Sequence, residues 1–219
     1  MAKIVAGETM AETPRIEFFY DCSSPWTYFA FTRMVPMAER LGVTVTWRPI
    51  LVGGVFNAVN QQVYAARESM FSDPANRRKL DYFVKDLGDW AALCGVRAII
   101  PEGHPISSVR AMRGAFFAEE QGLLLPYSRA VFEAYWGGDT PDISSDEVLA
   151  TICRRVGLEP EAFFDAISGQ PCKDRLRENT EELIARGGFG SPTVFIDGDD
   201  MYFGNDRLPL VEHRLRQPR

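Results

Sequence analysis

Strand-forming sequence lies only near the two ends of this chain, and this distribution limits its possible folds more than any other feature. Residues 15–20 ("RIEFFY") and 43–47 ("VTVTW") are rich in the β-branched and aromatic residues that strands favour. The next such segment, "SPTVFIDGDDMYFG" at 191–204, predicts two strands joined by an Asp-Gly turn. From about residue 73 to 170 the sequence has the apolar spacing of helices instead. A sheet must therefore be assembled from opposite ends of the chain.

The segment between the first two strands predicts a helix over residues 24–42. Ser24 is a favoured N-cap, Pro25 suits the first helical position, and Gly42 can end the helix. Pro36 is expected to kink or interrupt it near Val35, because proline cannot donate the backbone hydrogen bond of a helix interior. A strand, a helix and a strand with short links predict a right-handed unit with parallel strands.

The central helices separate this unit from the C-terminal strands. One helix is predicted to begin at Asp73 and to end at Gly95, and Ser144 with Glu147 has the pattern of a capping box ahead of another. The order of elements predicts an α/β fold, a thioredoxin-like βαβ…αββα domain with an inserted all-helical domain. We expect a leader at 1–13, the thioredoxin-like domain at 14–56 and 171–219, and the helical domain at 57–170.

The composition argues against several classes of protein. The net charge is −6 and no basic stripe is present, which argues against a nucleic-acid partner. No apolar run approaches the ~20 residues of a membrane-spanning helix, and the N-terminus lacks the pattern of a signal peptide. The four cysteines form no Cys-x-x-Cys motif, and no histidine stands at metal-ligand spacing from them. We therefore expect a cytoplasmic protein with reduced thiols, no metal site and no membrane partner.

The turn Ser24-Pro25-Trp26-Thr27 lies where a thioredoxin-type protein places its two redox cysteines. A thiol–disulfide oxidoreductase needs two sulfurs there, and this turn has neither. Cys22 stands two residues before the turn, and we interpret it as a small buried side chain. Taken alone, serine followed by proline predicts helix capping and nothing more.

A family resemblance rests on four stretches: "FFYDCSSPWTYFAF", "WRPILVGGVFN", "HPISSVRAMRGAFFA" and "GGFGSPTVFIDGDDMYFGNDRL". In these the chain resembles the 2-hydroxychromene-2-carboxylate isomerases and the kappa-class glutathione transferases, two variants of the DsbA-like fold. The resemblance extends over residues 15–215. It implies glutathione as the cofactor, a small aromatic or chromene-like substrate, and a homodimer.

The resemblance makes Ser24 the catalytic residue, with Ser24 and Thr27 at the positions of the two cysteines of DsbA-like redox proteins. Unpaired N–H groups and the dipole at a helix N-terminus favour negative charge, and a serine hydroxyl there can donate a hydrogen bond to a thiolate. Each unit by which the pKa of a bound thiol falls corresponds to about 1.4 kcal/mol. We therefore expect Ser24 to stabilise the thiolate of glutathione, a role that is compatible with capping.

The resemblance also implies further cofactor contacts. Gly190 and Ser191 would flank glutathione beside a cis Pro192, and Asn205 with Asp206 would bind its γ-glutamyl end. The alternative for these two stretches is a plain turn before a strand and ordinary capping of the last helix.

Two contacts follow from the resemblance less directly. Lys79, with Tyr82 as the landmark, aligns with a lysine that reaches the glycine carboxylate of glutathione, although it can equally be an ordinary exposed charge. Either Asn57 or Asn60 falls where the family places an asparagine near the active serine, and Asn60 fits slightly better.

The chain departs from the family in places that bear on specificity. Ser107 stands where the isomerases often have asparagine, and residues 60–71 lack the usual Gly/Pro-rich loop, so the sequence does not identify the substrate. His104 and His213 show no partner pattern of acid–base catalysis, and we interpret both as structural.

The sequence therefore predicts a glutathione-dependent isomerase of aromatic-compound catabolism, similar to 2-hydroxychromene-2-carboxylate isomerase and acting by reversible thiolate addition. One alternative is a kappa-class-like glutathione transferase, which would release the conjugate as its product. An alternative of another class is a redox-inactive DsbA-like protein that binds a peptide or partner.

Overall fold

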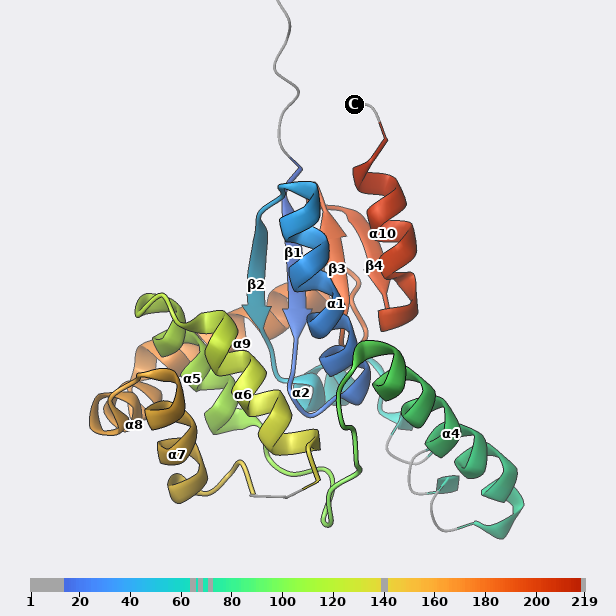
Figure 1. The fold of residues 1–219 in the computed structure, drawn as a ribbon, viewed down its shortest axis with the longest axis horizontal. Coiled ribbons are helices and arrows are strands. Elements are labelled where there is room, and N and C mark those ends of the chain that lie inside the picture. The colour runs from blue at the N-terminus through green and yellow to red at the C-terminus, as the bar shows by residue number, and fades with distance from the viewer. Residues whose placement is uncertain (1–13, 64–65, 67–68, 71–72, 139–141, 218–219) are drawn as a thin grey trace, which may run out of the picture.

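The computed structural model describes residues 14–63, 66, 69–70, 73–138 and 142–217, and the predicted leader at 1–13 lies outside them. These residues contain a four-stranded sheet with the order β2-β1-β3-β4 (Figure 1). Strand β1 pairs in parallel with β2, whereas β3 is antiparallel to both β1 and β4. The sheet joins the two ends of the chain, as the sequence predicts. The strands are β1 (Ile16–Tyr20), β2 (Val45–Pro49), β3 (Thr193–Ile196) and β4 (Asp200–Phe203).

Helices cover the sheet and fill most of the chain between β2 and β3. Helix α1 (Pro25–Leu41) begins at the N-cap Ser24 and ends at Gly42, whose φ of 65° is left-handed. No described helix is both long enough and apolar enough to cross a membrane. The other helical elements are α2 (Val52–Val59), η1 (Pro74–Asn76), α4 (Arg77–Cys94), α5 (Val109–Glu120), α6 (Leu124–Trp136), α7 (Asp146–Val156), α8 (Pro160–Ser168), α9 (Gln170–Ala185), η2 (Asn205–Arg207) and α10 (Leu208–Leu215).

Alternating side chains of β1 divide the core between the two faces of the sheet. Phe18 belongs to the larger cluster, which includes Phe31 of α1, Val211 of α10 and residues of α5 to α9. Phe19 points to the opposite face and packs with Leu183 of α9 and with α2. In the view of Figure 1, α5 to α8 lie at the lower left of the molecule, and α4 extends to the lower right. The division into a thioredoxin-like domain and an inserted helical domain stays a prediction.

Two predictions about helix ends are corrected by the structure. Helix α1 continues through Pro36 to Leu41, so the proline does not interrupt it. Helix α7 has Ser145 as its N-cap, and no side-chain hydrogen bond caps it. The hydroxyl of Ser144 instead donates to Asp142 Oδ1 at 2.6 Å. Aspartate side chains readily form such local hydrogen bonds two residues along the chain, and these compete with helix capping. The capping box predicted at Ser144 is therefore wrong.

Helix α2 has no counterpart among the predicted elements. It contains Gly53 and Gly54, and glycine disfavours a helix by about 1 kcal/mol relative to alanine. Its N-cap residue, Leu51, supplies no side-chain cap. A carboxylate from another part of the chain accepts its first N–H instead: Asp21 Oδ2 lies 2.8 Å from the nitrogen of Val52. Tertiary contacts thus stabilise a helix that the local sequence disfavours.

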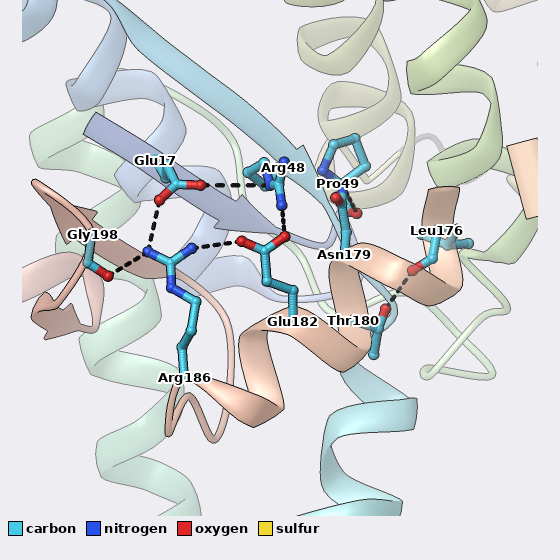
Figure 2. A network of polar contacts seen from close by, with 9 residues as sticks. All are labelled: Glu17, Arg48, Pro49, Leu176, Asn179, Thr180, Glu182, Arg186 and Gly198. Carbon is cyan, nitrogen blue, oxygen red and sulfur yellow. Dashed lines mark hydrogen bonds and ion pairs between the residues drawn. The ribbon is translucent and has the colours of Figure 1, made fainter. Parts of the chain in front are cut away.

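Four charged side chains, Glu17, Arg48, Glu182 and Arg186, form what we call the Arg186 network on the face of the sheet that packs against α9 (Figure 2). Arg186 binds Glu17 at 2.7 Å and Glu182 at 2.9 Å. Arg48 pairs with the same two carboxylates and lies 3.8 Å from Glu17. Every charge in this network therefore has an opposite charge beside it.

Candidate functional site

A cavity of about 510 Å³ lies beside the first turn of α1. It is bordered by the turn before α1, by parts of α2 and α4, by the segment from Ile100 to Val109, and by Ser191 of the loop before β3. Its aromatic residues are Trp26, Phe56, Phe83, Trp136 and Phe203. Its polar side chains are Asp21, Ser23, Ser24, His104, Ser107, Ser108 and Ser191. A mainly apolar wall with a few polar groups is typical of a small-molecule site.

Ser24 lies at this cavity and at the N-terminus of α1, where the sequence predicts it. Its Oγ accepts the N–H of Thr27 at 3.3 Å and donates to the carbonyl oxygen of Ser191 at 3.2 Å. The first turn of α1 contains no acidic residue. The positive end of the helix dipole therefore meets the cavity without a neighbouring carboxylate in that turn, which favours a bound anion.

The loop before β3 is held against this turn by Ser191. The Oγ of Ser191 accepts the backbone N–H of Asp21 at 3.0 Å and lies 2.8 Å from Thr27 Oγ1. The bond between Ser191 and Pro192 is cis, as the family resemblance implies. Thr27 has no exposed surface and does not line the cavity, so it positions the loop from behind.

A buried carboxylate, Asp21, lies behind the turn and has no exposed surface. Its Oδ1 accepts the N–H of Ser23 at 2.9 Å, and its Oδ2 accepts the N–H of Val52 at 2.8 Å and the hydroxyl of Ser108 at 3.1 Å. Burial raises the pKa of the Asp21 carboxyl, and these hydrogen bonds oppose the rise. In the described part of the chain no arginine, lysine or histidine forms an ion pair with it. Its charge is balanced by dipoles alone.

Gly190 lies where a side chain would collide with the cavity wall. A Cβ atom there would stand 2.7 Å from the ring of Phe203, which lines the cavity. The carbonyl of Gly190 accepts the hydroxyl of Thr193 at 2.8 Å, so the loop cannot easily shift away. Glycine at this position therefore lets an aromatic ring of β4 reach the site.

Asn205 and Asp206 follow β4 and do not line the cavity. Asn205 is buried, and its carbonyl accepts a hydrogen bond from Arg33 at 3.0 Å. Its Nδ2 is buried without a hydrogen-bond partner among the described residues. Asp206 is exposed and pairs with Arg207 at 2.7 Å. Their roles in cofactor binding stay predictions.

Lys79 and Asn60 also lie outside the cavity wall. Lys79 is exposed on α4, and Asn60 is the C-cap of α2. Asn57 is exposed as well. In place of either asparagine, α2 presents Gly53 and Phe56 to the cavity. The cofactor contacts predicted for Lys79 and Asn60 stay predictions.

His104, which the sequence led us to interpret as structural, lies on the cavity wall. Its Nδ1 is 2.8 Å from Tyr135 Oη, and its ring centroid is 5.2 Å from that of Trp136. The hydroxyl of Tyr135 also accepts the N–H of Ile106 at 2.9 Å. The tyrosine lies 31 positions away in the sequence, so no local spacing predicts the contact. For Asp21 a signal was present, because it stands three residues before Ser24 in "FFYDCSSPWTYFAF", the first stretch that carries the family resemblance.

Cys22, the cysteine nearest to the turn, is 1% exposed and does not line the cavity. Its carbonyl accepts the indole N–H of Trp136 at 2.8 Å. Burial raises the pKa of its thiol well above the ordinary value, which disfavours a reactive thiolate. All four cysteines are free, and the described residues contain no group of three acidic, histidine or cysteine side chains arranged for a metal ion. The burial of Cys22 supports a structural role.

Comparison with known proteins finds relatives that match most of this chain. Residues 15–216 match the family model of the DsbA-like thioredoxin domain. The chain is 32% identical over 204 residues to a 2-hydroxychromene-2-carboxylate isomerase of Pseudomonas putida, covering 91% of this chain and 93% of that protein. It is 26% identical over 220 residues to glutathione S-transferase kappa 1 of Rattus norvegicus, covering 94% and 93% of the two chains.

A solved structure of a 2-hydroxychromene-2-carboxylate isomerase has the same fold. It superposes with a TM-score of 0.76 at 30% sequence identity and covers 92% of this chain and 94% of its own. The family model, which matches residues 15–216, includes the sheet, the helical segment and the turn that carries Ser24. The chain therefore belongs to the DsbA-like thioredoxin-domain family, within the group that contains the 2-hydroxychromene-2-carboxylate isomerases and the kappa-class glutathione transferases.

Proposed function

We propose that this protein is a glutathione-dependent isomerase of aromatic-compound catabolism that acts on a 2-hydroxychromene-2-carboxylate or a similar small aromatic acid. The observation that carries this proposal is the placement of the Ser24 hydroxyl at a helix N-terminus on a mainly apolar cavity. That combination suits an anionic sulfur beside an aromatic substrate. The 32% identity to an isomerase over nearly the whole chain supports the substrate class.

Two features of the site fit glutathione. The cavity volume of about 510 Å³ lies in the ~300–1,000 Å³ range of small-molecule sites. Asn205 lies outside the cavity wall, and its Nδ2 is a buried donor without an acceptor among the described residues, so a ligand carboxylate would satisfy it only if the loop after β4 moved to expose it. We assign the cofactor contacts to Ser24, Ser191, Gly190 and Pro192 at the thiol end and to Asn205 with Asp206 at the γ-glutamyl end. Lys79 and Asn60 complete the assignment.

When bound, glutathione supplies a thiolate that adds reversibly to an activated carbon, so that a bond in the substrate can rotate before the thiol leaves. Ser24 lowers the pKa of that thiol by donating its hydroxyl proton, now directed to the Ser191 carbonyl at 3.2 Å. The N-terminus of α1 adds its dipole at the same place. The rings of Trp26 and Phe203 exclude water and orient the aromatic substrate.

A kappa-class-like transferase is the second candidate, because glutathione S-transferase kappa 1 of rat is a relative over 94% of the chain. It would share the thiolate site and differ only in releasing a stable conjugate.

The proposal also includes a reducing, cytoplasmic compartment, supported by four free cysteines. The proposal includes the homodimer that the family resemblance implies, with the exposed Tyr82 and Leu93 of α4 as candidate contacts.

The test is a calorimetric titration of glutathione into the wild type and Ser24→Ala, with thiolate absorbance and turnover of 2-hydroxychromene-2-carboxylate measured in parallel. We expect binding with a thiolate signal in the wild type, and loss of that signal with a fall in turnover of about 10²–10³-fold in Ser24→Ala, the usual effect of removing one anion-stabilising donor. A conjugate that accumulates without isomer would favour the transferase.

Ser145→Ala is the matched control, because Ser145 is also the N-cap of a helix, α7, and does not line the cavity. It should retain the thiolate signal and the turnover. Full activity of Ser24→Ala would contradict the assignment of Ser24. No binding at millimolar glutathione in the wild type would contradict the cofactor and favour a redox-inactive binding protein.

A further inference from the structure

The contact between Ser108 and Asp21 is not used by the chemistry assigned to Ser24. Ser108 is the N-cap of α5, is 4% exposed and lines the cavity. Its hydroxyl makes no capping hydrogen bond and donates to Asp21 Oδ2 at 3.1 Å. A serine at a helix N-terminus ordinarily accepts a backbone N–H. Ser108 does not cap α5 in this way and instead contacts a buried carboxylate.

The protonation state of Asp21 determines whether Ser108 can donate or accept a hydrogen bond toward a ligand in the cavity. A hydroxyl has one proton, and Ser108 donates it to Asp21, so toward the cavity Ser108 can only accept. No described residue donates a hydrogen bond to Ser108 Oγ, which leaves that capacity available. If Asp21 gains a proton, the hydrogen bond reverses, and Ser108 becomes a donor toward the cavity. Protonation of Asp21 therefore changes Ser108 from a hydrogen-bond acceptor to a hydrogen-bond donor toward the cavity.

The surroundings of Asp21 allow both states. Two backbone N–H groups, from Ser23 and Val52, hold the carboxylate in place whichever state it is in. Burial raises its pKa, so the protonated form is less costly than for an exposed aspartate. The other titratable groups nearby are the buried thiol of Cys22 and the ring of His104 on the same cavity wall. Among the described residues no ion pair joins Asp21 to a positively charged side chain.

We propose that Ser108 is a catalytic residue that accepts the hydroxyl proton of the substrate and returns it to the released ring oxygen, with Asp21 as the positioning residue through which it acts. This inference rests on the proposed function. In a 2-hydroxychromene-2-carboxylate, one carbon carries both a hydroxyl and the ring oxygen. When the bond to the ring oxygen breaks, the hydroxyl oxygen becomes a carbonyl oxygen and loses its proton to Ser108 Oγ. Ser108 passes its own proton to Asp21 Oδ2.

The return step restores the starting state. The released ring oxygen leaves with the electron pair of the broken bond. Ser108 gives it a proton and recovers one from Asp21, so that the protein ends with the protons it began with. No oxidant, reductant or further reactant is needed. The pair thus supplies general acid–base catalysis, which typically contributes about 10²–10⁴-fold to a rate.

The experiment measures kcat and KM for 2-hydroxychromene-2-carboxylate, together with calorimetric glutathione binding, in the wild type, Ser108→Ala and Ser108→Thr. We expect kcat of Ser108→Ala to fall about 100-fold, with glutathione binding and its thiolate signal retained. Ser108→Thr keeps the hydroxyl and should recover most of the lost kcat. Ser128→Ala is the matched control, because Ser128 is a serine buried to 2% exposure that bonds Tyr20 and does not line the cavity.

Several outcomes would overturn the proposal. A kcat for Ser108→Ala close to that of the wild type would do so, and so would a loss of glutathione binding that parallels the loss of turnover. If Ser108→Ala does not fold, the single-turnover rate of the wild type is compared in water and deuterium oxide, and an unchanged rate overturns the proton transfer. A wild type that binds glutathione but converts no chromene overturns the isomerase function, and this proposal with it.

Discussion

Two polar networks tie the same sheet to its surrounding helices, and they differ in how charge is balanced. In the Arg186 network two arginines and two glutamates compensate one another, and Arg186 also donates to the carbonyl of Gly198 at 2.8 Å (Figure 2). The network beside the cavity consists of Asp21, Thr27, Ser108 and Ser191. It contains one full charge, that of Asp21, and otherwise hydroxyl and amide dipoles.

The difference separates a structural network from a functional one. Compensated ion pairs resist any change in protonation, because each charge stabilises the charged form of its partner. A carboxylate held only by dipoles can gain or lose a proton at a smaller cost, and the hydroxyls around it can reorient. The Arg186 network therefore suits holding β1 and α9 together, whereas the network around Asp21 suits chemistry.

The largest effect on stability should follow from breaking the compensated network. Arg186→Met removes the ion pairs to Glu17 and Glu182 and leaves Arg48 as the one arginine of the network for two carboxylates. We expect the free energy of unfolding to fall by about 2–3 kcal/mol, less than for a fully buried pair because these side chains are partly exposed. Urea unfolding measures the loss, and turnover of the folded variant should stay that of the wild type.

Arg40→Met is the control for this change. Arg40 pairs with Glu212 at 2.8 Å, but its side chain is 53% exposed, and exposed pairs contribute about 0.2–1 kcal/mol. Equal losses in the two variants would mean that the Arg186 network is no more important than an ordinary surface pair. A large loss of turnover in folded Arg186→Met would remove the distinction between the two networks.

Replacing Asp21 should have a smaller effect on the free energy of unfolding, and this effect should depend on pH. Its folded pKa is raised, so between its ordinary value of 3.8 and that raised pKa the folded state binds more protons than the unfolded state. The contribution of Asp21 to stability therefore improves as pH falls through this window and is least favourable above it. The free energy of unfolding of the wild type minus that of Asp21→Asn should increase as pH falls. A difference that decreases over the same window would show that the carboxyl is stabilised as a charge.

The smallest effect is expected at Cys22, which lies beside the functional network but outside the cavity. Cys22→Ala should cost about 1 kcal/mol of stability, as expected for a small buried deletion, and leave turnover unchanged. In the wild type, alkylation of Cys22 should be slower than that of Cys94, because burial raises the Cys22 thiol pKa and Cys94 is only partly buried. Rapid alkylation of Cys22 with loss of activity would place this thiol in the site.

Local chemistry made much of the fold predictable. The cap at Ser24, the left-handed Gly42, and the Asp197–Gly198 turn between β3 and β4 all depend on residues close together in the sequence. Helix α2 was not predictable in this way, because its glycines argue against it and its N-terminal hydrogen bond comes from Asp21. The family resemblance added the cis Pro192, which the residues alone did not require.

The sequence by itself determined where the strands and most helices lie and which serine stands at the first helix N-terminus, since these depend on patterns within a few turns of chain. Only the tertiary structure decided which side chains meet at the cavity. Asp21 and Ser108 are 87 positions apart, and Asp21 and Ser191 are 170 apart. Their contacts depend on how the sheet and helices pack around a common core, and packing is a property of the whole chain that no local pattern contains.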